Sequence, residues 1–252
     1  MIMIINFIKK VNNFDNNLYT ISMTTLSNDQ IKQLNNYSVY LEPTGTPLFD
    51  ATNVDSSLSI IKLISEAPTG PIAASFFMRR VGMFISMQFY MMTMYDEIWD
   101  GPLEDLAFFA TTEYGNKTIS TYIREEHFRE TRENRAEDVQ LIWKQQCYPI
   151  IQQLRATCSI SPLTLWENVF GYLLWHYYVF FDNEAIADQA KQDWSIMQDE
   201  SIWIAFTSKS FLSNYLKGKS PAQLINSPVR TTCCFSKDVP GLQKCGFCPF
   251  NS

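Results

Sequence analysis

Four of the six cysteines lie in the last 20 residues of the chain, at Cys233, Cys234, Cys245 and Cys248. The last two form a C-x-x-C knuckle, in which the two intervening residues let the chain turn so that both sulfurs face one metal centre. Gly246 is expected to supply a positive φ in this knuckle, and Pro249 to stiffen its exit. Residues 239–241, Val-Pro-Gly, predict a turn that folds the knuckle back onto the adjacent cysteine pair.

Four thiolates close together suit either a tetrahedral Zn²⁺ ion or an iron–sulfur cluster. Neighbouring residues of an extended chain point in opposite directions, so Cys233 and Cys234 are poorly placed to chelate one small ion. A [2Fe–2S] cluster is larger and holds two irons, so its ligands can diverge more. The spacing favours iron over zinc, and it leaves open a zinc-stapled tail or a disulfide formed on oxidation.

The charges around these cysteines suit an anionic centre. Arg230, Lys237 and Lys244 stand against Asp238, which gives a local formal charge of +2. Four thiolates, two ferric irons and two sulfides carry about −2, so the cations offset part of that charge and favour reduction.

Taken together, these residues resemble the C-terminus of the FhuF-like ferric-siderophore reductases. The shared pattern is Arg230-x-x-Cys-Cys, ten residues, then Cys-x-x-Cys-Pro249. Residues 162–168, Pro-Leu-Thr-Leu-Trp-Glu-Asn, are similar to the LW-x-N helix start of that family, and residues 74–80 with the apolar helix and hairpin that follow fit its layout. The likeness covers roughly residues 55–252, most strongly at the tail, and the first 50 residues match nothing in it.

The resemblance implies an oxidoreductase that passes one electron from a [2Fe–2S] cluster to siderophore-bound Fe³⁺ and releases Fe²⁺. It implies no side chain acting as acid, base or nucleophile, and it implies these cluster ligands: Cys233, Cys234, Cys245 and Cys248. The expected partners are a ferric siderophore and an external electron donor, a ferredoxin or a flavin reductase. The alternative is a non-enzymatic siderophore- or partner-binding protein whose tail is stapled by zinc.

Composition limits the other classes of function. The 252 residues carry a formal charge of −6, which argues against a broad basic face for nucleic acid. The sequence lacks a G-x-G-x-x-G or G-x-x-x-x-G-K-[ST] pattern, so a glycine-rich nucleotide or flavin site is not expected. At the N-terminus Lys9 and Lys10 follow the apolar run instead of preceding it, so we expect no export signal and a cytoplasmic protein. Peripheral association with a membrane stays open.

The elements expected around the tail are mostly helical. Nine glycines in 252 residues argue against a turn-rich all-β fold. Apolar periodicity predicts helices near residues 55–67, 71–94, 134–158, 161–181, 183–197 and 201–216. Two β-rich runs flank a Gly-Asn turn and predict a hairpin over residues 106–123.

The predicted fold is therefore α+β, helix-dominated, with a small antiparallel sheet or hairpin and a C-terminal iron–sulfur tail. The expected organisation is an N-terminal extension of unclear structure (1–50), a helix-rich body (51–222) and a [2Fe–2S]-binding segment (223–252).

Two arginines interrupt the apolar helix expected at residues 71–94. Arg79 and Arg80 are costly there unless they are paired, so the first interpretation is a buried ion pair with an acidic residue. The second interpretation is a contact to an anionic ferric chelate.

The remaining cysteines and the two histidines are expected to be structural. Cys147 and Cys158 lie 11 residues apart on one apolar helical stripe, so we expect core thiols. His176 lies between aromatic residues and is expected to be a hydrogen-bonded core residue, and His127 lies in a charged stretch and is expected to be solvated.

Overall fold

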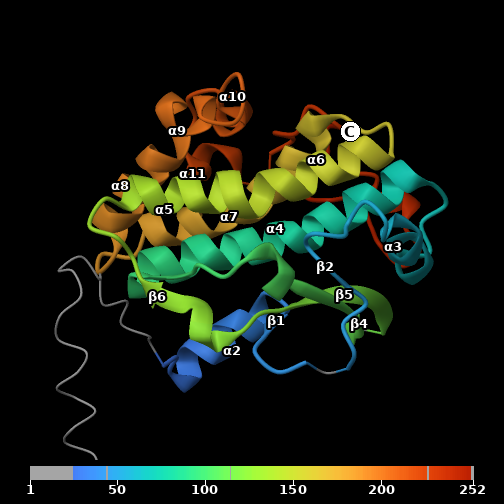
Figure 1. Cartoon of the computed structure of the whole chain (residues 1–252). Coiled ribbons are helices and arrows are strands. Elements are labelled where there is room, and N and C mark those ends of the chain that lie inside the picture. The colour runs from blue at the N-terminus through green and yellow to red at the C-terminus, as the bar shows by residue number, and fades with distance from the viewer. Residues whose placement is uncertain (1–24, 44, 114, 226, 251–252) are drawn as a thin grey trace, which may run out of the picture.

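The computed structural model describes residues 25–43, 45–113, 115–225 and 227–250. Helices dominate it, as the sequence predicted, and the helix-dominated α+β class is confirmed (Figure 1). The helices are α2 (Asn28–Asn36), α3 (Leu58–Ser65), α4 (Gly70–Tyr95), α5 (Arg135–Leu141), α6 (Tyr148–Thr157), α7 (Pro162–Phe181), α8 (Ala187–Gln198), α9 (Glu200–Ile204), α10 (Phe211–Leu216) and α11 (Pro221–Leu224).

Two small sheets accompany the helices. Their strands are β1 (Val39–Tyr40), β2 (Phe49–Asp50), β3 (Glu97–Trp99), β4 (Ala107–Glu113), β5 (Asn116–Tyr122) and β6 (Phe128–Glu130). The predicted hairpin is present as β4 and β5, and β2 pairs antiparallel with β4. The four-stranded sheet is mixed, because β1 runs parallel to β5 at one edge. Residues 25–50 therefore contribute a helix and two strands.

The long helices α4 and α7 lie against each other in the centre of the fold (Figure 1). Pro71 stands in the first turn of α4, and Ser161 caps α7 by accepting a hydrogen bond from the Leu163 amide at 3.2 Å. The two backbones come close at Gly82, where an added Cβ would lie 3.0 Å from the carbonyl oxygen of Asn168. This crossing therefore needs a glycine. The close approach of the two helices also brings their polar residues together.

Two predicted helices are divided in the structure. The stretch from residue 134 contains a π-helical segment, Ile142–Cys147, after which α6 begins with Pro149 in its first turn. The proline lies in the first turn of α6, where its missing N–H costs nothing, so the predicted helix over 134–158 is divided at this point. The helix expected over residues 201–216 is wrong as one element, because Ser210 caps a separate α10 by accepting from the Ser213 amide.

Within the described part of the chain, no helix combines the length and the apolar character that crossing a bilayer requires.

Candidate metal centre

The cysteine tail is tied to α4 and α7 by a short chain of buried hydrogen bonds. Asn168 of α7 donates from Nδ2 to the hydroxyl of Ser75 on α4 at 2.9 Å and to its carbonyl at 3.0 Å. The Ser75 hydroxyl in turn donates to the carbonyl oxygen of Cys234 at 2.7 Å. The backbone of the adjacent cysteine pair is thus fixed by both long helices.

Glu167, one residue before Asn168, holds the two threonines that lead into Cys233. Its side chain is 1% exposed, and each carboxylate oxygen accepts two hydrogen bonds. Oε1 accepts from the Thr231 amide at 2.9 Å and its hydroxyl at 2.7 Å, and Oε2 accepts from the Thr232 amide at 3.0 Å and its hydroxyl at 2.5 Å. A buried carboxylate that receives four donors is a rigid anchor for the segment before the cysteines.

Arg230 completes this anchor. Its guanidinium is 4% exposed and lies 3.7 Å from Glu167 Oε2. It donates from Nη1 to the Glu167 carbonyl at 2.9 Å and from Nε to the Thr232 carbonyl at 3.3 Å. The sequence suggested Arg230 as a cation beside the cysteines, and the structure also gives it a scaffolding role.

The chain turns sharply after the adjacent cysteines. Phe235 has φ +55°, a left-handed conformation that costs a non-glycine residue about 1–3 kcal/mol. Its amide donates to the sulfur of Cys233 at 3.3 Å, and Ser236–Asp238 continue as a 3₁₀ turn. The segment that follows the adjacent cysteines is therefore bent instead of extended.

The expected turn before the knuckle is present. The Leu242 amide donates to the Val239 carbonyl at 3.1 Å, and Gly241 has φ +77°. In the knuckle itself the Cys248 amide donates to the Cys245 carbonyl at 3.1 Å. The expectation for Gly246 is wrong, since its φ is not positive and an added Cβ would meet no atom within 4 Å.

The ring of Phe247 seats the knuckle on α7. A Cβ added at Gly171 would lie 3.3 Å from that ring, so the small residue on the helix makes room for the aromatic one. Cys234 and Cys248 are buried, while Cys233 and Cys245 are half-buried.

Two of the four tail cysteines are in direct contact. Cys234 and Cys245 are hydrogen-bonded to each other through their side chains. That bond, with the charges of Arg230 and Arg79, holds the pKa of Cys234 well below its ordinary value, and the same bond raises the pKa of Cys245. Lys237 lies within electrostatic range of the other two thiols, Cys233 and Cys248.

The structure does not distinguish the two candidate metals. Over the residues whose placement is described, no group of three or more His, Cys, Asp or Glu side chains is set to hold one metal ion. A zinc ion and a [2Fe–2S] cluster both take four thiolates, so the choice between them stays a prediction from the cysteine spacing.

A buried cation supports the fit of an anionic centre. Arg79 donates from Nη1 to the Ser236 hydroxyl at 2.6 Å, but its buried Nε has no hydrogen-bond partner in the described structure. It makes no ion pair with any described carboxylate, and its neighbours include Cys234 and Cys245. A buried guanidinium that faces thiols calls for a negative partner, and a cluster of charge about −2 supplies one.

The neighbouring arginine has the opposite environment. Arg80 pairs with Glu113 at 2.8 Å and donates from Nε to the Ile119 carbonyl at 2.6 Å. The expected buried ion pair is therefore found for Arg80 and not for Arg79. Among the surface cations of the tail, Lys237 pairs with Asp238 at 2.6 Å.

The other cysteines and the histidines lie in structural positions. Cys147 is fully buried and burial raises its pKa, while Cys158 is half-buried at the end of α6. His176 is the expected core histidine, since its Nε2 lies 2.8 Å from the Tyr37 hydroxyl. The expectation of a solvated His127 is wrong, because its Nε2 lies 2.8 Å from Asp105 and its side chain is 25% exposed.

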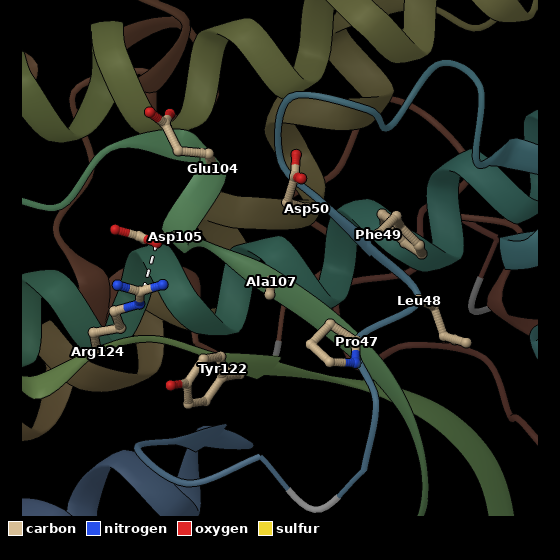
Figure 2. Close-up of a pocket in the computed structure, with 9 residues that line it drawn as sticks. All are labelled: Pro47, Leu48, Phe49, Asp50, Glu104, Asp105, Ala107, Tyr122 and Arg124. Atoms are coloured by element: carbon tan, nitrogen blue, oxygen red, sulfur yellow. Dashed lines mark ion pairs between the residues drawn. The ribbon is translucent and has the colours of Figure 1, made fainter.

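A cavity of about 260 Å³ lies beside β2 and β4 (Figure 2). Two of its three acids are already engaged: Figure 2 shows the ion pair between Arg124 and Asp105, and Asp50 accepts from the Thr52 amide at 2.8 Å. None of the described cysteines lines this cavity, so it lies apart from the candidate metal centre.

Comparison with known proteins gives no family for the chain. The sequence matches no protein-family model, and it matches none of the curated proteins. The resemblance of its tail to ferric-siderophore reductases therefore rests on the motif residues.

The sequence did not reveal the roles of Ser75, Glu167 and Asn168 in holding the tail. One signal was present, since Glu167 and Asn168 interrupt an otherwise apolar helix. Polar groups in such a helix need buried partners, and here the partners come from a segment more than 60 residues away.

Proposed function

We propose that this chain is a ferric-siderophore reductase that holds a [2Fe–2S] cluster at Cys233, Cys234, Cys245 and Cys248. The observation that carries the proposal is the proximity of two of these thiols, Cys234 and Cys245, to the buried guanidinium of Arg79, which pairs with no carboxylate among the described residues. Four thiolates around Zn²⁺ would carry the same charge of about −2, so the preference for iron rests on the adjacency of Cys233 and Cys234 in the sequence.

When bound, the cluster supplies one-electron storage, and the reaction needs no acid, base or nucleophile. The residues of the chain have three tasks in this scheme. Glu167, Asn168 and Ser75 fix the backbone that carries the ligands. Arg79 and Arg230 offset the negative charge, which favours the reduced state. Phe247 covers one side of the knuckle against α7.

The substrate is an iron chelate outside the protein surface. A siderophore binds Fe³⁺ far more tightly than Fe²⁺, so one added electron loosens the metal. We propose an external donor, a ferredoxin or a flavin reductase, as the source of that electron, and the cytoplasm as the compartment. Nucleic acid is not among the proposed partners.

The direct test is single-turnover reduction without air. The purified protein is reduced with dithionite, freed of excess reductant and mixed with a ferric siderophore in the presence of a coloured Fe²⁺ chelator. The proposal predicts about one Fe²⁺ captured per chain as the visible bands return to the oxidised form. Cys234→Ser is the control and should release none, and an equal yield from wild type and Cys234→Ser refutes the proposal.

A further inference from the structure

The fold brings together two tail cysteines that the sequence keeps apart. Cys234 and Cys245 share a side-chain hydrogen bond, although ten residues separate them in the sequence. The turn at residues 239–241 folds the chain back between them. The sequence favours a different pair, because the C-x-x-C spacing of Cys245 and Cys248 is typical of redox-active dithiols. The structure instead places the sulfur of Cys245 against a cysteine of the adjacent pair.

A small reagent can reach these two cysteines. Cys234 and Cys245 line a cavity of about 180 Å³, and the other two tail cysteines do not line it. Trp175 also lines this cavity and is 46% exposed, so the cavity reaches the molecular surface. A cavity holds a water molecule once its volume reaches about 10–15 Å³, so this one has room for hydrogen peroxide, which has two oxygen atoms.

We infer that Cys234 and Cys245 form a disulfide when hydrogen peroxide oxidises the metal-free chain. One sulfur attacks the peroxide, so that a sulfur–oxygen bond forms, the oxygen–oxygen bond breaks and a water molecule leaves. The second sulfur attacks the resulting sulfenic acid, so that the sulfur–sulfur bond forms and a second water molecule leaves. In total the two thiols lose two electrons and two protons, and one peroxide molecule becomes two water molecules.

This disulfide excludes a metal from the tail. A metal is bound by thiolates, and the disulfide removes two of the four that are proposed as ligands. The oxidised chain should therefore take up no metal until a reductant cleaves the bond, which makes the pair a peroxide-sensitive control on loading. The effect on loading rests on the proposed function, whereas the disulfide itself does not.

The test maps the disulfide in the full chain. The metal-free, reduced protein is treated with about one equivalent of hydrogen peroxide, its remaining thiols are alkylated, and it is digested with trypsin. Cleavage after Arg230, Lys237 and Lys244 puts the adjacent pair and the knuckle in separate peptides, 231–237 and 245–252. Mass spectrometry should find these two peptides joined by one disulfide, each with one alkylated cysteine, and two of the six thiols of the chain lost.

Serine variants identify the cysteine that takes part in each peptide. Cys233→Ser and Cys248→Ser should keep the cross-link, and so should Cys147→Ser, the matched control outside the tail. Cys245→Ser should abolish it. Three results overturn the inference: a wild-type disulfide within peptide 245–252, no disulfide in the tail, or a cross-link that persists in Cys245→Ser.

Metal uptake tests the effect on loading, with Cd²⁺ as a thiol-seeking probe whose bonds to sulfur absorb in the ultraviolet. The reduced wild type should bind Cd²⁺, the disulfide-bonded protein should lose most of that absorbance, and a phosphine reductant should restore it. Equal Cd²⁺ uptake by the reduced and the oxidised protein contradicts the control on loading. A reduced wild type that binds no Cd²⁺ defeats the proposed metal centre and leaves the disulfide map intact, so the two failures are distinguishable.

Discussion

Substitution of Glu167 by Gln tests whether the buried carboxylate holds the cysteine segment. The change keeps the size of the side chain but replaces one carboxylate oxygen with an amide NH₂, which cannot accept a hydrogen bond. Four donors from Thr231 and Thr232 meet at this carboxylate, two at each oxygen. Glu167→Gln therefore leaves two of them facing a donor, and it removes the carboxylate 3.7 Å from Arg230.

The expected destabilisation follows from these contacts. A buried donor left without an acceptor costs about 1–3 kcal/mol, and breaking a buried ion pair on one side costs about 3–5 kcal/mol. The two costs overlap, because the same oxygen takes part in both, and a threonine hydroxyl can rotate to another acceptor. We expect the free energy of unfolding to fall by about 3–5 kcal/mol in total.

A matched control is Asp193→Asn in α8. Asp193 is fully buried, pairs with Arg135 at 2.7 Å and accepts from the Thr93 hydroxyl at 2.8 Å, but it lies outside the tail. Both variants should lose similar stability in urea titrations followed by circular dichroism. Only Glu167→Gln should lose visible cluster absorbance and, in the metal-free protein, react faster with a thiol reagent at the tail cysteines.

Two outcomes would refute this reasoning. One is a Glu167→Gln variant with wild-type stability and full absorbance. The other is an Asp193→Asn variant that loses the cluster as completely as Glu167→Gln does, since that would make cluster loss a general consequence of instability.

Three further predictions concern the cysteines, the charge and the pH dependence. Ser in place of any one of Cys233, Cys234, Cys245 and Cys248 should abolish most of the visible absorbance, whereas Cys147→Ser and Cys158→Ser should keep it; full absorbance in Cys234→Ser would contradict the ligand assignment. Arg79→Gln should lower the reduction potential by roughly 70–100 mV, which is the Coulomb energy of one charge at about 7–10 Å with an effective dielectric constant of about 20. Redox titration should show little change for Arg80→Gln, whose charge is paired with Glu113, and equal shifts for both variants would count against the role of Arg79. Burial lowers the pKa of His176 to about 4, so between pH 6.5 and 4 the unfolded chain takes up a proton that the native protein does not. The stability of the wild type should therefore fall as the pH falls through this window, by at most about 3 kcal/mol, and His176→Gln should have a shallower pH dependence in urea titrations; identical pH dependences would argue against a neutral buried imidazole.

The turns and helix starts that are determined by neighbouring residues could be predicted from the sequence. The Gly-Asn turn fixed the hairpin of β4 and β5, and Ser161 with Pro162 marked the start of α7. The Val-Pro-Gly turn before the knuckle was likewise visible, because a positive φ at Gly241 follows from residue type.

Features that depend on distant contacts were not visible. The parallel pairing of β1 with β5 joins residues about 80 positions apart, and two-residue strands carry no periodicity. The sequence also gave Arg79 and Arg80 the same environment, yet one faces the sheet and Glu113 while the other faces the cysteines. Adjacent residues on a helix point about 100° apart, so only the packing of α4 could distinguish them.

The motif located the candidate site but not its support. Spacing alone proposed the four tail cysteines as ligands, with Arg230 beside them, and that assignment stays a prediction. The clamp by Glu167 was missed because it depends on α7 meeting a segment 64 residues away in the sequence.

The central claim is that the tail holds an iron–sulfur cluster, and metal analysis with electron paramagnetic resonance tests it most directly. The protein is purified without air, iron, zinc and acid-labile sulfide are quantified per chain, and the dithionite-reduced sample is measured at low temperature. The account predicts about two irons and about two sulfides per chain, a red-brown colour and a signal from one unpaired electron after reduction. One zinc per chain, with no labile sulfide and no signal on reduction, would contradict it.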